Sequence, residues 1–89
     1  MQPVVVVYTT TSCPFCRSAK AWLTARRVAY REVDVTGDDA TRQALVERSG
    51  GQRTVPQIFV GDVHVGGYTD LVALDAAGKF NPLLDAPAA

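Results

Sequence analysis

The stretch Thr11-Ser12-Cys13-Pro14-Phe15-Cys16 holds both cysteines of the 89-residue chain, with two residues between them. It follows a continuous apolar run from Val4 to Tyr8 and precedes a segment whose apolar residues recur at helical spacing. The β-branched run, which has no polar alternation, predicts a central strand covered on both faces. Pro14 suits the first helical turn, where a backbone N–H has no partner. The thiols are therefore expected between a buried strand and a helix over about residues 14–27.

The rest of the chain alternates between strand-like and helix-like segments. These are a strand over 28–35, a helix over 39–49 ended by Gly50-Gly51, a strand over 55–60, a turn at Gly61-Asp62, a strand over 63–65, and a last helix capped by Thr69 or Asp70 and running to about Gly78. The order β-α-β-α-β-β-α demands a parallel strand pair with a right-handed crossover, followed by an antiparallel hairpin and a closing helix. We expect an α/β fold with a four-stranded mixed sheet flanked by helices. Residues 1–89 are expected to form a single domain, with a disordered tail from about residue 85.

Apolar side chains with helix or strand periodicity are expected to form the core. They are Trp22, Tyr30, Val33, Val35, Ala40, Ala44, Leu45, Val46, Phe59, Leu71, Val72, Leu74 and Phe80.

Composition excludes several classes of function. Hydrophobic residues make up 47% of the chain, which is too apolar for a disordered protein. Nine basic and nine acidic residues cancel, and no cluster of Lys or Arg indicates a nucleic-acid surface. The run Val4–Val7 is too short to span a membrane, and Met1-Gln2-Pro3 lacks the pattern of a secretion signal. We therefore expect a cytoplasmic protein that binds neither nucleic acid nor membrane.

Two thiols in so short a chain can be a structural staple, half of a metal site or a redox couple. A disulfide closing so small a ring would stabilise the fold by only about 2 kcal/mol, against more than 4 for a loop of ~100 residues. A structural zinc site needs four ligands, and His64 is the one other soft donor here. A metal or cluster shared between two chains remains an alternative. A Cys-x-x-Cys pair after a strand in a βαβ pattern favours the redox couple.

The spacing also suggests different roles for the two thiols. Cys13 lies at the N-terminal end of the predicted helix, where unpaired N–H groups and the helix dipole favour a thiolate. Cys16 lies one turn later, close enough to attack a mixed disulfide formed at Cys13. We therefore expect Cys13 to be the nucleophile and the more exposed sulfur, and Cys16 to be the buried resolving thiol.

Two further segments have both an ordinary and a functional interpretation. Pro56 in Thr54-Val55-Pro56 is either a simple strand start or a cis proline that turns the Val55 backbone towards the cysteines. Gly66-Gly67-Tyr68-Thr69-Asp70 is either an ordinary capped turn or a site where backbone N–H groups receive a carboxylate and Asp70 receives an ammonium.

Taken together, Cys13-Pro14-Phe15-Cys16, Thr54-Val55-Pro56 and Gly66-Gly67-Tyr68-Thr69-Asp70-Leu71 resemble a glutaredoxin of the small bacterial dithiol type. The resemblance runs from Val4 to Leu84. It implies the thioredoxin fold, a cis Pro56 and glutathione as the electron donor. No metal is expected, because the chain lacks four soft ligands. The residues implied to bind glutathione are Cys13, Phe15, Thr54, Val55, Pro56, Gly67, Tyr68, Thr69 and Asp70.

The chain departs from the glutaredoxin pattern at two positions. Phe15 stands where the family most often has tyrosine, and it keeps the apolar wall but loses a hydroxyl. Thr10 stands where related proteins commonly have a lysine that helps to hold a glutathione carboxylate. Arg53 or Arg42 is a candidate to supply that charge. Other polar residues, namely Arg17, Lys20 and His64, are interpreted as surface side chains.

These features predict a glutathione-dependent thiol–disulfide oxidoreductase. Its implied partners are glutathione and proteins that carry a disulfide or a bound glutathione, with ribonucleotide reductase as one candidate, and a monomer is expected. One rival is a carrier in which two chains hold an iron–sulfur cluster through Cys13, although Pro14 and Cys16 argue against it. Another is a thioredoxin-like donor fed by thioredoxin reductase, which the Gly66–Leu71 segment disfavours.

Overall fold

The computed structural model describes residues 3–85 and contains a single mixed sheet. Its elements are β1 (Val5–Thr9), α1 (Pro14–Ala25), β2 (Tyr30–Asp34), α2 (Asp39–Arg48), β3 (Gln57–Val60), β4 (Val63–Gly66), α3 (Tyr68–Ala76) and α4 (Phe80–Asp85). The four strands lie in the order β2-β1-β3-β4. β1 runs parallel to β2 and antiparallel to β3, and β3 pairs with β4 as an antiparallel hairpin. The predicted α/β fold with a four-stranded mixed sheet is confirmed.

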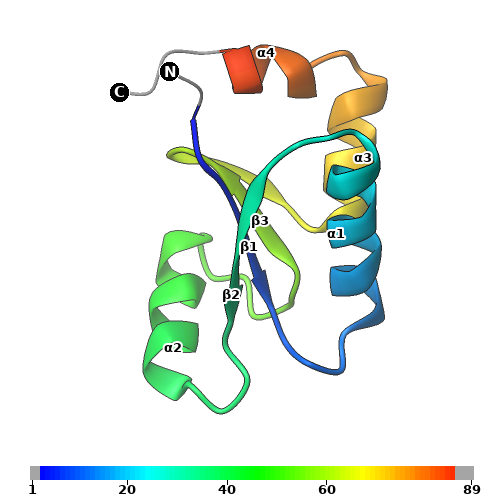
Figure 1. Cartoon of the computed structure of the whole chain (residues 1–89). Helices are drawn as coiled ribbons and strands as arrows, with labels where there is room; N and C mark the ends of the chain where they lie inside the picture. Colours follow the sequence, from blue (N-terminus) through cyan, green and yellow to red (C-terminus); the bar gives the residue numbers. More distant parts are fainter. Residues whose placement is uncertain (1–2, 86–89) are drawn as a thin grey trace.

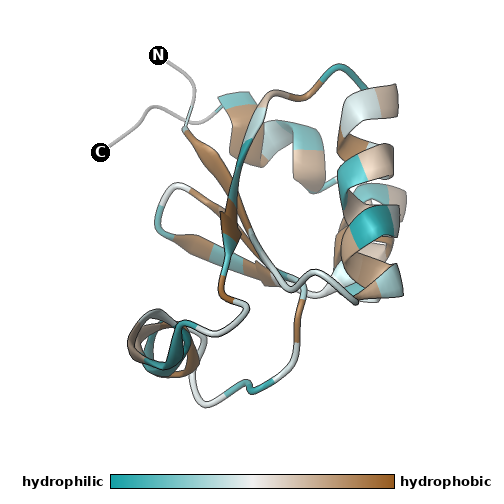
Figure 2. Cartoon of the chain, turned by 60° about the horizontal axis from the view of Figure 1, so that its bottom comes forward, coloured by the Kyte–Doolittle hydropathy of each residue, from teal (hydrophilic) through white to brown (hydrophobic). Residues whose placement is uncertain are grey.

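Helices cover both faces of the sheet, with α1 and α3 on one side and α2 on the other (Figure 1). The face towards α1 and α3 carries the main core, in which alternate residues of β1 and β3 meet Leu23 and Leu71. The core residues are Val5, Val7, Ala19, Leu23, Ile58, Val60, Leu71 and Phe80. Figure 2 shows the central strands β1 and β3 as mainly hydrophobic, whereas the helices carry hydrophobic and hydrophilic stretches together. This arrangement fits strands that lie between helices which are each apolar on one side.

The face towards α2 is covered less completely than the sequence predicts. Val6 and Tyr8 of β1 are half-buried there, and Leu45 is the one fully buried residue of α2. Arg48 extends over this face instead. Its guanidinium lies 4.1 Å from the centre of the Phe59 ring and donates a hydrogen bond to the Tyr8 hydroxyl. A long cationic side chain can cover an aromatic ring and keep its charged end in water. Ala40 and Ala44 of this helix are exposed, which corrects their assignment to the core.

Helix α1 ends in a left-handed turn, and the next strand starts two residues later than predicted. Arg27 adopts a left-handed conformation with φ 58°, a position where glycine is usual. Its N–H bonds to the Thr24 carbonyl, and the Val28 N–H bonds to the Leu23 carbonyl. Because Val28 donates to the helix, it cannot join the sheet, and β2 begins at Tyr30 rather than at the predicted residue 28.

The predicted boundaries of the second half differ in two places. β3 begins at Gln57 rather than at Val55, after a cis Val55–Pro56 peptide bond, so the cis proline that the resemblance implied is present. α3 begins at Tyr68 with Gly67 as its N-cap, so neither Thr69 nor Asp70 is the N-cap residue, although the Asp70 carboxylate accepts from the Gly67 N–H. Within α3, Leu71 is buried but Val72 is 38% exposed, which corrects its assignment to the core.

Helix α4 is the element that the sequence did not predict. Phe80, expected in the core, is 1% exposed and meets the Trp22 ring edge-on at 5.3 Å between ring centres. Pro82 is the third residue of α4, where a helix needs no backbone N–H donor. The predicted tail disorder falls on residues 86–89, which lie outside the described part of the chain, whereas Asp85 is still helical.

Candidate active site

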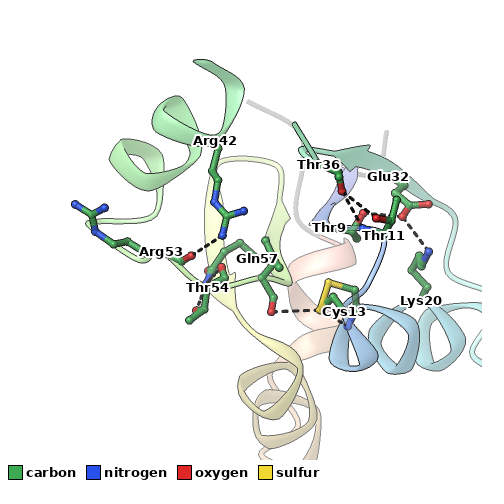
Figure 3. The surroundings of a disulfide bond; sticks show 12 residues. Thr9, Thr11, Cys13, Lys20, Glu32, Thr36, Arg42, Arg53, Thr54 and Gln57 are labelled. Atoms are coloured by element: carbon green, nitrogen blue, oxygen red, sulfur yellow. Dashed lines mark hydrogen bonds and ion pairs between the residues drawn. A yellow bond between two sulfur atoms is a disulfide. The ribbon is translucent and has the colours of Figure 1, made fainter. Parts of the chain in front are cut away.

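Cys13 and Cys16 form a disulfide at the start of α1, where β1 gives way to the helix (Figure 3). Cys13 is the N-cap of α1, and its sulfur accepts a hydrogen bond from the Cys16 backbone N–H at 3.1 Å. Cys13 is 8% exposed and Cys16 only 1%. The predicted order of exposure is confirmed, although both sulfurs are largely covered. In the reduced protein, the same N–H and the helix dipole would favour a thiolate at Cys13.

The loop before Cys13 is tied to the end of β2. The Thr11 N–H donates to the Thr36 hydroxyl oxygen at 2.9 Å, and the Thr36 N–H donates to an Asp34 carboxylate oxygen at 2.8 Å. Hydrogen bonding from the Thr36 hydroxyl, and then from the Thr36 backbone N–H, holds the pKa of Asp34 below its usual value. A charged acceptor at Asp34 therefore fixes the position of the loop that presents the first cysteine.

A second carboxylate, that of Glu32, bonds to two side chains beside α1. Glu32 forms an ion pair with Lys20 at 2.9 Å and accepts a hydrogen bond from the buried Thr9 hydroxyl at 2.7 Å. The bond to Lys20, and then the bond to Thr9, lowers the pKa of Glu32. The Lys20 charge is therefore engaged with Glu32 rather than with the cysteines, and Arg17 is exposed, in line with the surface interpretation of both.

A cavity of about 480 Å³ lies next to the disulfide. It is lined by eight of the nine predicted glutathione-binding residues, namely Phe15, Thr54, Val55, Pro56, Gly67, Tyr68, Thr69 and Asp70. Cys13, the ninth, adjoins it, with its sulfur 3.5 Å from the Val55 carbonyl oxygen. Phe15 is 59% exposed and stacks on Tyr68, with 6.4 Å between ring centres. The fold thus brings three separate motifs together around one cavity.

The start of α3 forms one wall of this cavity. The Gly67 N–H donates to an Asp70 carboxylate oxygen at 2.9 Å, which satisfies one backbone donor of the first turn. Gly66 has φ 112°, and a Cβ there would lie 2.5 Å from the same Asp70 oxygen. At Gly67 a Cβ would make only ordinary contacts. Of the two glycines, Gly66 is therefore the one that the geometry requires, because it makes room for Asp70.

The two arginines proposed to replace the missing lysine lie apart from this cavity. Arg42 donates from its guanidinium to the Arg53 carbonyl oxygen at 3.2 Å. Both line a separate hollow of about 420 Å³ beside α2. Figure 3 shows the Arg53 guanidinium directed away from Cys13. As positioned, neither arginine places its charge at the disulfide.

Four residues of the cavity lining were not expected to bind a ligand, namely Gln52, Gln57, His64 and Val65. Gln57 was assigned no role, and His64 was interpreted as a surface side chain. His64 is exposed, but its Nε2 lies 2.6 Å from Gln57 Oε1. The available signal was Gln57 itself, a polar residue at the start of an otherwise apolar strand.

Within residues 3–85, no group of three or more His, Cys, Asp or Glu side chains is placed to hold a metal ion. Over the same residues, no helix is both long and apolar enough to cross a membrane.

Comparisons with known proteins agree on one family. The glutaredoxin family model matches residues 5–65. A probable glutaredoxin of Synechocystis is 45% identical over 80 residues, covering 90% of this chain and 91% of the relative. Glutaredoxin 3 of Escherichia coli K12 is 46% identical over 80 residues, covering 90% and 95%. A crystal structure of a buckwheat glutaredoxin–glutathione complex matches with a TM-score of 0.83 at 30% identity, covering 92% of this chain and 76% of that one.

Proposed function

The chain belongs to the glutaredoxin family of thiol–disulfide oxidoreductases, and from that premise we propose that it reduces disulfides with glutathione through Cys13 and Cys16. The placement of Cys13 carries the proposal. It caps α1, it is the more exposed sulfur, and it adjoins the cavity through the Val55 carbonyl. Cys13 is the nucleophile of the cycle and Cys16 the resolving thiol.

The cycle begins when the Cys13 thiolate attacks a disulfide of the substrate, forming a mixed disulfide and releasing one substrate thiolate. For a protein disulfide, Cys16 then attacks Cys13, which releases the reduced substrate and leaves the Cys13–Cys16 disulfide. One glutathione thiolate attacks Cys13 and frees Cys16. A second glutathione releases oxidised glutathione and regenerates the dithiol. For a glutathionylated protein, Cys13 takes up the glutathione, and one further glutathione completes the cycle.

The cavity beside Cys13 is the proposed glutathione site. The backbone of Thr54 and Val55, ahead of Pro56, pairs with the extended tripeptide. The N-terminus of α3, from Gly67 to Thr69, receives the carboxylate of the γ-glutamyl end, and Asp70 pairs with its ammonium group. Phe15 and Tyr68, which stack on each other, form the apolar wall. The buckwheat complex supports glutathione as the ligand of this fold.

The remaining assignments are proposals of the same kind. The chain acts as one domain and as a monomer in the cytoplasm, where a glutathione pool keeps thiols reduced. Its protein partners carry disulfides or bound glutathione, and ribonucleotide reductase is a candidate among them. Glutathione serves as a co-substrate, and no resident metal is proposed.

Replacing Cys16 by serine tests whether Cys13 is the nucleophile and Cys16 the resolving thiol. With a glutathione mixed disulfide as substrate, Cys16→Ser should keep the wild-type rate, since Cys13 and glutathione complete that cycle. With a protein disulfide, the rate should fall at least about ten-fold, because a bimolecular attack replaces the intramolecular one. Both rates are measured by coupling oxidised glutathione to glutathione reductase. Loss of both activities would show that Cys16, and not Cys13, is the attacking thiol.

The glutathione site is tested by Asp70→Asn. The amide keeps an oxygen that can accept from the Gly67 N–H, so the start of α3 should persist. The pairing with an ammonium is lost, and KM for glutathione should rise roughly ten-fold or more. A change of that size corresponds to the free energy of one hydrogen bond to a charged group. Asp75→Asn in the same helix, where Asp75 pairs with Arg26, serves as the control for charge. An unchanged KM in Asp70→Asn would place the γ-glutamyl end elsewhere.

A further inference from the structure

Gln57 is a buried polar side chain at the point where β3 begins. It is 3% exposed and precedes the apolar residues Ile58, Phe59 and Val60. A buried amide costs free energy unless its donors and acceptor are paired. Gln57 meets this demand at both ends, with Thr54 on one side and His64 on the other.

The hydrogen bonds fix the orientation of the Gln57 amide. Its nitrogen Nε2 lies 3.0 Å from the Thr54 carbonyl oxygen and 3.3 Å from the Thr54 hydroxyl oxygen. A backbone carbonyl can only accept, so the amide nitrogen must face it. The amide oxygen therefore faces His64, and His64 must carry a proton on Nε2 in order to donate across the 2.6 Å separation.

The pairing of β3 with β4 places His64 where it can reach Gln57. Ile58 pairs with Gly66 and Phe59 with His64, so Val65 is an extra residue on β4. Such a bulge redirects the side chains next to it. The His64 ring packs on Phe59 with 4.8 Å between ring centres, which holds the imidazole in place.

We propose that His64 and Gln57 are positioning residues, which act in series to hold the Thr54–Val55 backbone in the conformation that receives the thiol peptide. His64 orients the Gln57 amide, and Gln57 fixes the Thr54 carbonyl. Val55 is thereby left with its carbonyl towards Cys13. The proposal rests on the glutathione site proposed above, but the hydrogen-bond chain can be tested without glutathione.

The kinetic test compares three variants of β4. His64→Phe keeps a ring against Phe59 but removes the hydrogen-bond donor. It should raise KM for glutathione roughly five-fold and leave kcat unchanged, because a change of that size corresponds to the free energy of one neutral hydrogen bond. His64→Gln offers an N–H of similar reach and should restore KM. Val63→Ala, at an exposed position outside the cavity, should behave as wild type.

A spectroscopic test uses the fact that His64 is the sole histidine of the chain. In the reduced wild-type protein without glutathione, the His64 Nε2 proton should give a resolved NMR signal, because its hydrogen bond slows exchange with water. Gln57→Met, which keeps the length of the side chain but not its amide, should abolish that signal.

The two tests separate the failure of this inference from the failure of the proposed function. If wild type turns over with glutathione but KM is unchanged in His64→Phe, or if kcat falls in parallel with the rise in KM, the positioning role is wrong. A wild-type spectrum without the Nε2 proton, or with the proton on Nδ1, also overturns it. If wild type shows no activity with glutathione, the proposed function itself fails, and the NMR result still decides whether the hydrogen-bond chain exists.

Discussion

Cys13→Ser is expected to abolish turnover with every disulfide substrate, by at least about a thousand-fold in kcat/KM, because the remaining thiol, Cys16, is buried and cannot reach a substrate disulfide. A serine hydroxyl is not ionised near neutral pH and does not attack a disulfide. Glutathione-coupled turnover of a glutathione mixed disulfide measures the effect directly. The loss corresponds to about 4 kcal/mol or more of transition-state free energy.

The Cys13→Ser substitution should leave the start of α1 unchanged. Cys13 is the N-cap of α1 and accepts from the Cys16 N–H. Serine is among the best N-cap residues, so the start of the helix should be preserved. Cys16→Ser makes the same chemical change three residues later and serves as the matched control. If Cys13→Ser retained more than about a tenth of the wild-type activity with an unchanged circular dichroism spectrum, Cys13 could not be the nucleophile.

Phe80→Ala is expected to destabilise the protein by about 3–5 kcal/mol, the usual cost of removing a buried phenylalanine. Phe80 attaches α4 to the core and meets Trp22 edge-on. A chain of this length is stable by only about 4–13 kcal/mol in total, so much of the folding free energy would be lost. The midpoint of thermal unfolding should fall by more than about 12 °C.

Chemical denaturation of the oxidised protein, followed by Trp22 fluorescence and by circular dichroism, measures this loss. Asn81→Ala, the next residue of α4 and an exposed one, should change stability by less than about 0.5 kcal/mol. A cost below about 1 kcal/mol for Phe80→Ala would mean that α4 is not packed on the core as described.

Local patterns predicted most of the elements correctly. The apolar run of β1, the start of α1 at Pro14 and the end of α2 at Gly50-Gly51 all lie where the sequence placed them, to within about one residue. Errors arose where a backbone group takes a partner outside its own element. The Val28 N–H bonds back to α1, so β2 starts late, and Gly67 rather than Thr69 precedes α3.

Hydrophobic periodicity did not predict which side chains of α2 cover the sheet. Ala44 and Leu45 have apolar character in the sequence, yet only Leu45 is buried. Part of the cover of that face comes from Arg48, which packs on Phe59 and bonds to Tyr8. Hydrophobic periodicity does not register an arginine as a packing residue, because it classifies the side chain by its charged end.

Local sequence indicated the order of the four strands and the first three helices, the position of the Cys-x-x-Cys pair at a helix N-terminus, and the glutaredoxin resemblance. These depend on the periodicity, caps and motifs of neighbouring residues. The tertiary structure was needed to show that Phe80 attaches a fourth helix and that His64 bonds to Gln57. It also decided that neither Arg42 nor Arg53 directs its charge at Cys13. Such contacts depend on how strands and helices pack across the sheet, and local sequence does not specify which side chains that packing brings together.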